Sequence, residues 1–99
     1  RLVSRAQPCG PTEVARRAAF FVQRFPGGPL APEARLLLAR AEEESFWRGE
    51  KEALRRAADA YQEVAKARAG DASAEARKAF RRLSAKKPQR APRPPPLCR

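Results

Sequence analysis

The stretch that decides the fold is FVQRFPGGPLAPEAR, residues 21–35. Its first five residues continue a helical pattern of apolar and polar positions, and the PGGP sequence at 26–29 stops it. Pro32 followed by Glu33 is typical of a first helical turn. Proline has no amide hydrogen, but amides of the first helical turn have no hydrogen-bond partner within the helix. An acidic side chain there interacts favourably with the positive end of the helix dipole. The stretch therefore predicts a helix, a tight turn and a second helix.

The pattern continues on both sides of this turn. The first helix is expected to begin near Thr12, whose hydroxyl can cap it. Its apolar stripe recurs at intervals of four, three and four residues: Val14, Ala18, Phe21 and Phe25. The second helix, up to Trp47, is apolar on nearly every side, which is typical of a helix packed between two others.

Two more helices follow, over about residues 51–69 and 73–85, with breaks expected at 26–31, 48–50 and 70–72. The third has one apolar and one charged side. Ser73 is a candidate cap for the fourth, whose expected buried residues are Ala76, Ala79, Phe80 and Leu83. We expect no strand in this span.

Composition supports an all-α fold with a thin core. Alanine makes up 21 of the 99 residues, isoleucine and methionine are absent, and 19 residues are large and apolar. Close-packed helices suit such a chain, whereas strands favour β-branched residues.

The charge is concentrated at the two ends of the chain. Of the formal net charge of +11, the lead-in (residues 1–11) holds +2, the helical domain (12–85) +4 and the proline-rich tail (86–99) +5. The tail contains PQRAPRPPP at 88–96, which favours an extended polyproline conformation.

The chain also matches itself at a shift of 42–43 residues. The stripe of the first helix falls on Ala57, Tyr61, Val64 and Arg68, and Glu33-Ala34-Arg35 falls on Glu75-Ala76-Arg77. Each copy is a helix, a glycine-containing turn and a second helix. The repeat predicts two stacked antiparallel helical hairpins.

Residues 21–35 resemble the junction between repeats in bacterial tetratricopeptide-like (TPR-like) proteins, where an aromatic residue and proline end one repeat and a Pro-Glu-Ala helix opens the next. Leu38-Ala39 and the set Ala57, Tyr61 and Val64 are similar to that family's helix residues. Arg68 and Ala69 depart from its usual aromatic residue and proline. The resemblance implies protein–protein interaction within a larger assembly, and favours the bacterial envelope or periplasm over the cytoplasm.

No set of residues predicts catalysis, a cofactor or a structural metal. Histidine is absent, and two cysteines cannot complete a four-thiolate site. The Glu42-Glu43-Glu44 run is expected to be a solvated face pairing with Arg40 or Arg48. We therefore expect a protein that is not an enzyme.

Three groups of residues are candidates for binding. Phe20, Phe46 and Trp47 either pack on neighbouring helices or contact a protein partner. The candidate phosphate contacts are basic residues of the fourth helix and the tail: Arg77, Lys78, Arg81, Arg82, Lys86, Lys87, Arg90 and Arg93. Cys9 and Cys98 can form a disulfide in an oxidising compartment, pair with another chain, or remain thiols.

Together these features predict a non-catalytic interaction module or scaffold subunit, with protein partners or self-association. The alternative is a small basic helical nucleic-acid-binding protein, associated with ribosomes or chromatin. A third hypothesis is an accessory subunit whose tail lies on an anionic membrane surface.

Overall fold

A computed structural model describes residues 10–92 of the chain. Four helices follow one another: α1 (Pro11–Arg24), α2 (Ala31–Trp47), α3 (Ala53–Lys66) and α4 (Asp71–Ser84). No strand occurs within residues 10–92. The all-α fold that the sequence predicts is therefore confirmed.

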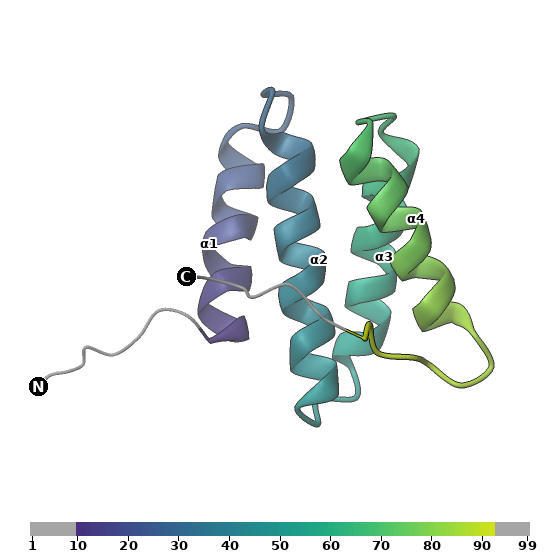
Figure 1. Ribbon diagram of the computed structural model, residues 1–99. Helices are drawn as coiled ribbons and strands as arrows, with labels where there is room; N and C mark the ends of the chain where they lie inside the picture. Colours follow the sequence, from purple (N-terminus) through teal and green to yellow (C-terminus); the bar gives the residue numbers. More distant parts are fainter. Residues whose placement is uncertain (1–9, 93–99) are drawn as a thin grey trace, which may run out of the picture.

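The helices pack in chain order, each antiparallel to the one before it (Figure 1). Helix α2 lies between α1 and α3, which explains why its sequence is apolar on nearly every side. Helix α4 packs on α3 and touches α2, whereas α1 packs on α2 alone among these helices. The result is two stacked helical hairpins.

The turn between α1 and α2 is closed by the residues that predicted it. The amide of Gly28 donates to the carbonyl of Phe25 at 3.1 Å, and that of Ala31 donates to Gly28 at 3.1 Å. Arg35 reaches back from α2 and donates to the Pro26 carbonyl at 3.2 Å. Both hairpin arms are thus tied to the same short loop.

The core is built mainly from alanines and lies among α2, α3 and α4. Tyr61 and Val64 of α3 are the largest apolar side chains that are fully buried. The core cluster consists of Leu36, Ala39, Ala57, Tyr61, Val64, Ala72, Ala76, Ala79 and Leu83. Alanine at so many contact positions allows the helix backbones to approach closely.

Both predicted helix caps are wrong. Helix α1 begins at Pro11 after Gly10, so Thr12 lies inside the first turn. Helix α4 begins at Asp71, and Ser73 lies within it. The buried Ser73 hydroxyl instead accepts a hydrogen bond from the Ala69 amide at 2.7 Å and donates one to the Val64 carbonyl at 2.7 Å.

The third helix is also shorter than predicted, because the chain leaves the helical conformation after Lys66. Arg68 (φ 53°) and Gly70 (φ 63°) both adopt positive φ angles in the turn to α4. Glycine tolerates this region, and a single left-handed residue is a common way to end a helix.

Candidate functional site

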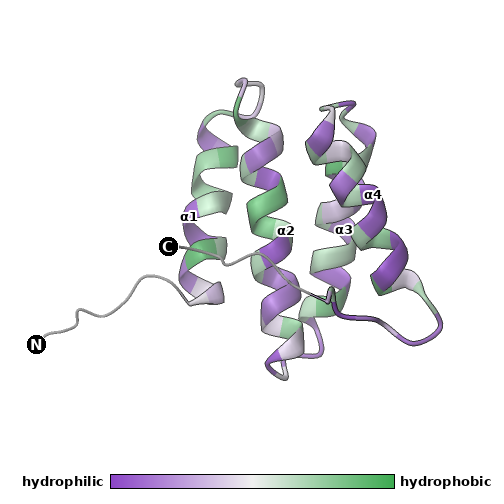
Figure 2. Ribbon diagram, in the orientation of Figure 1, coloured by the Kyte–Doolittle hydropathy of each residue, from purple (hydrophilic) through white to green (hydrophobic). Residues whose placement is uncertain are grey.

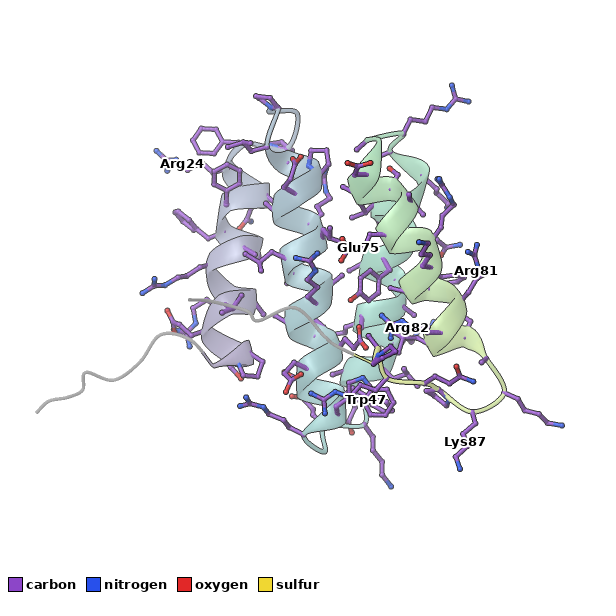
Figure 3. All side chains as sticks on the ribbon, viewed as in Figure 1. Arg24, Trp47, Glu75, Arg81, Arg82 and Lys87 are labelled. Atoms are coloured by element: carbon purple, nitrogen blue, oxygen red, sulfur yellow. The ribbon has the colours of Figure 1, made fainter. Side chains whose placement is uncertain are left out.

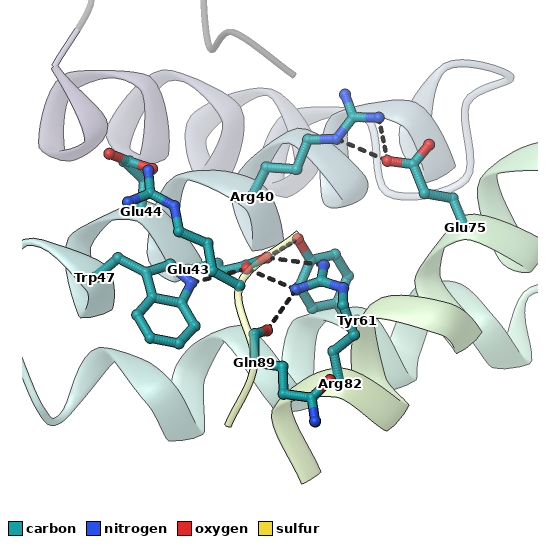
Figure 4. Close-up of polar contacts among 9 residues, drawn as sticks. Arg40, Glu43, Glu44, Trp47, Tyr61, Glu75, Arg82 and Gln89 are labelled. Carbon is teal, nitrogen blue, oxygen red and sulfur yellow. Dashed lines mark hydrogen bonds and ion pairs between the residues drawn. The ribbon is translucent and has the colours of Figure 1, made fainter. Parts of the chain in front are cut away.

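A buried carboxylate joins three of the four helices. Glu43 of α2 is only 7% exposed. Its carboxylate accepts hydrogen bonds from the Tyr61 hydroxyl at 2.7 Å and the Trp47 indole at 2.9 Å. Arg82 of α4 donates twice, at 2.9 and 3.3 Å (Figure 4). We call these four residues the Glu43 cluster.

The partners of Glu43 keep it ionised. Burial alone would raise the pKa of Glu43, but the hydrogen bonds from Arg82, Trp47 and Tyr61 lower it, and the net pKa lies below the ordinary value. The hydrogen bond to Glu43 raises the pKa of Arg82, and burial raises the pKa of Tyr61. A carboxylate that is ionised and accepts four hydrogen bonds is a weak base. The cluster is therefore suited to holding helices together.

Residues 85–92, which we call the strap, turn back after α4 and lie over the Glu43 cluster. Arg82 donates to the Gln89 carbonyl at 2.9 Å, and the Gln89 amide donates to the Arg82 carbonyl at 3.2 Å. Arg90 pairs with Glu44 at 3.0 Å. The strap thus closes one side of a groove between α2 and α4.

This groove has a volume of about 200 Å³ and carries both signs of charge. Its cationic side chains come from α2, α4 and the strap, and they face the three carboxylates of Glu43, Glu44 and Glu75. Arg40 and Glu75 form an ion pair across it, from α2 to α4 (Figure 4). Three of its four cations are paired with these carboxylates, and Lys78 is the one that makes no ion pair within residues 10–92.

The glutamate run is therefore not one solvated face. Glu44 does pair with Arg48, at 3.2 Å, as expected. Glu42 pairs with Arg56 of α3 at 3.0 Å. Glu43 points into the core, which contradicts the expectation. Its spacing of four from Ala39 and seven from Leu36 is the signal that could have shown this.

The predicted phosphate contacts divide into two groups. Arg77, Lys78, Arg81, Lys86 and Lys87 are exposed. Figure 3 shows Arg81 directed outward, whereas Figure 4 shows Arg82 directed toward Glu43. Arg82 and Arg90 are already paired with carboxylates. Arg93, Cys9 and Cys98 lie outside the described residues.

The predicted partner contacts are not brought together. Phe20 of α1 is 61% exposed. Phe46 and Trp47 are half-buried at the far end of α2, with ring centroids 4.7 Å apart. Trp47 packs against the core and belongs to the Glu43 cluster. Phe20 alone of the three is thus fully accessible.

Two further large apolar side chains, at the end of α1 and in the turn after it, are exposed. Phe25 is 50% exposed and Leu30 59% exposed, and the rings of Phe25 and Phe21 lie 5.2 Å apart. We call Phe20, Phe21, Phe25 and Leu30 the apolar end. Beside it is a shallow hollow of about 340 Å³ lined mostly by apolar side chains of α1 and α2, including Ala18, Ala34 and Leu37. The first-helix stripe is thus buried at Val14 and Ala18 but not at Phe25.

Other kinds of site are not seen among residues 10–92. That part of the chain contains no group of three or more side chains able to hold a metal ion. None of its helices has the length and apolar character needed to cross a membrane. No known protein family, curated protein or solved structure matches the chain, so the finding is a four-helix all-α domain of sequentially packed helices.

Proposed function

We propose that this chain is a TPR-like, non-catalytic module that binds another protein and serves as a scaffold subunit of a larger assembly. The observation that carries the proposal is the apolar end. Three large apolar side chains within residues 20–30, at the end of α1 and in the turn that follows it, are each at least half exposed. Exposed apolar clusters of this kind mark interaction surfaces.

The arrangement of the helices supports the same function. Helices that pack in chain order form an open-ended stack, in which each unit buries its apolar side on the next. A small core leaves such a stack dependent on neighbours. Here the helix at one end, α1, buries only Pro11, Val14 and Ala18.

The alternative function is nucleic-acid binding through the exposed basic residues of α4 and the strap. Arg77, Lys78 and Arg81 lie on one helix, and Lys86 and Lys87 follow it directly. Five cations can neutralise several phosphates. The described surface around them offers no exposed aromatic ring on which a base could stack.

One experiment separates the two functions. The tagged chain, the Phe20→Gln/Leu30→Gln variant and the Arg77→Gln/Arg81→Gln variant are purified from cells of the source organism. We expect a co-purifying protein that is lost with the first variant and kept with the second. Co-purifying nucleic acid that is lost only with the second variant would support the alternative and overturn our proposal.

A further inference from the structure

Within residues 10–92, helix α1 lacks a neighbour that its repeat counterpart has. In the internal repeat α1 matches α3, yet of these four helices α3 packs between two and α1 packs on α2 alone. Val14 and Ala18 are buried like their counterparts Ala57 and Tyr61. Phe21 is half-buried, whereas its counterpart Val64 is 0% exposed. Among the described residues, the position that α2 fills beside α3 is thus open beside α1.

The two ends of the stack have different surfaces. Helix α4 presents the exposed cations Arg77, Lys78 and Arg81, and Figure 2 shows a largely hydrophilic face there. The α1 side instead presents the apolar end. Terminal units of helical stacks need a polar outer face to stay in solution. Helix α4 is built as such a terminal unit, and α1 is not.

Charge indicates what kind of helix fits the open position. Helix α1 carries Arg16, Arg17 and Arg24 against Glu13, a net charge of +2. Helix α2, with four glutamates against two arginines, has a net charge of −2 and lies between the two basic helices α1 and α3. In this fold the acidic helix is the one that packs between basic ones.

Ion pairs between helices show the same complementarity. Glu42 of α2 meets Arg56 of α3 at 3.0 Å, and Glu43 of α2 meets Arg82 of α4 at 2.9 Å. On α1, Arg24 beside the apolar end makes no ion pair within the described residues, and its position is seen in Figure 3. Arg16 and Arg17 share the single carboxylate of Glu13. The positive charge that α1 offers a partner is therefore mainly that of Arg24, since the hollow itself is lined by one cation, Arg17, and one carboxylate, Glu33.

We propose that the apolar end binds an amphipathic helix of another protein, with acidic side chains flanking its apolar stripe. The proposal rests on the proposed function and specifies the partner. The helix takes the place beside α1 that α2 takes beside α3, and a large apolar side chain enters the hollow between Phe21, Leu30 and Leu37. A second copy of this chain fits less well, because docking two α1 helices brings arginines against arginines.

The test uses two synthetic helical peptides with the same leucine stripe, one flanked by glutamates and the other by lysines. Binding to the full chain is measured by fluorescence anisotropy at low and near-physiological salt. We expect the glutamate peptide to bind about five- to tenfold more tightly, the ratio that two or three exposed ion pairs give. The advantage should shrink as salt increases.

Variants of exposed residues locate the binding. Leu30→Gln should weaken both peptides, because it removes apolar surface that both use. Arg24→Glu should weaken the glutamate peptide and strengthen the lysine peptide. Arg77→Glu, the same charge reversal on α4, is the matched control and should leave the ratio unchanged. Circular dichroism checks that each variant keeps its helices.

Equal binding of the two peptides, tighter binding of the lysine peptide, or no binding of either would overturn the acidic-helix proposal. So would a dimer in sedimentation velocity that Leu30→Gln dissociates, which would assign the surface to a second copy. None of these results affects the purification experiment. Loss of a captured protein with Phe20→Gln/Leu30→Gln would still support the proposed function, and absence of such a protein would reject it independently.

Discussion

Glu43 is the single residue on which the contact between α2 and α4 most depends. Replacing it with glutamine keeps its size but removes the charge that faces Arg82. Breaking one partner of a buried ion pair is costly, because the other charge stays poorly solvated. We expect Glu43→Gln to lower the free energy of unfolding by about 2 kcal/mol in urea denaturation.

Glu44→Gln is the matched control for this prediction. It makes the same chemical change one residue further on, at a carboxylate whose partners Arg48 and Arg90 are exposed. Exposed ion pairs contribute about 0–1 kcal/mol. Equal losses of stability from the two variants would show that burial of Glu43 has no special effect.

The same residue predicts a pH dependence. The folded pKa of Glu43 lies below its ordinary value of 4.5, so its stabilising contribution is fully present above that pH and is lost as pH falls through the folded pKa. The stability difference between wild type and Glu43→Gln should therefore be constant above the ordinary pKa of 4.5 and shrink as the pH falls below it. Urea denaturation at several pH values measures it, and a difference that stays constant or grows on acidification would contradict the assignment.

The three glutamates at 42–44 are indistinguishable by residue type, yet their side chains have three different surroundings in the structure. A helix turns by about 100° per residue, so neighbours on one run must face different ways. The core spacing from Leu36 and Ala39 identifies the one that points inward. Glu43 pairs with Arg82, which is 39 residues away. This pairing depends on how α4 packs on α2, and the local sequence pattern does not specify that packing.

Ser73 ties the start of α4 to α3 and to the turn between them. It is 2% exposed, and its hydroxyl bonds the Val64 carbonyl of α3 and the Ala69 amide of the turn. Ser73→Ala leaves a buried amide and carbonyl without this partner, so we expect a loss of about 1–3 kcal/mol in thermal or urea unfolding. Ser84→Ala, at the exposed end of the same helix, should change stability by less than about 0.5 kcal/mol. Similar effects of the two changes would refute the role of Ser73.

Helix existence was predictable from the sequence, whereas helix ends were not. The 26–29 turn and the stripes of Ala57, Tyr61 and Val64 or Ala76 and Ala79 are local signals, and they led directly to the observed elements. Thr12 and Ser73 are good capping residues by type. Thr12 does not cap α1, because Pro11 already occupies the first helical position. Ser73 does not cap α4, because its hydroxyl bonds the Val64 carbonyl instead.

The amphipathic stripe of α1 predicts a buried face, and one neighbouring helix, α2, does not cover all of it. Periodicity shows which residues share a face, but it does not show whether this chain supplies the element that packs there. Phe25 is exposed for that reason. The sequence pattern placed Phe21 and Phe25 with the core and left Phe20 open as core or partner contact, and the packing order of the helices showed that the end of this stripe is surface.

The distribution of charge predicts how the chain binds nucleic acid. If all nine basic groups of α4 and the tail bound phosphate on duplex DNA, the affinity would depend steeply on salt. Each group would add about 0.9 to the slope of log affinity against log salt. The nine are Arg77, Lys78, Arg81, Arg82, Lys86, Lys87, Arg90, Arg93 and Arg99. Arg82 and Arg90 are held by Glu43 and Glu44, which lowers the number available. We expect weak DNA binding with a slope well below about eight, reduced further by Arg77→Gln/Arg81→Gln and unchanged by Phe20→Gln. A slope near about eight, or DNA binding that persists at near-physiological salt and disappears when residues 86–99 are deleted, would instead establish the basic surface as the functional one.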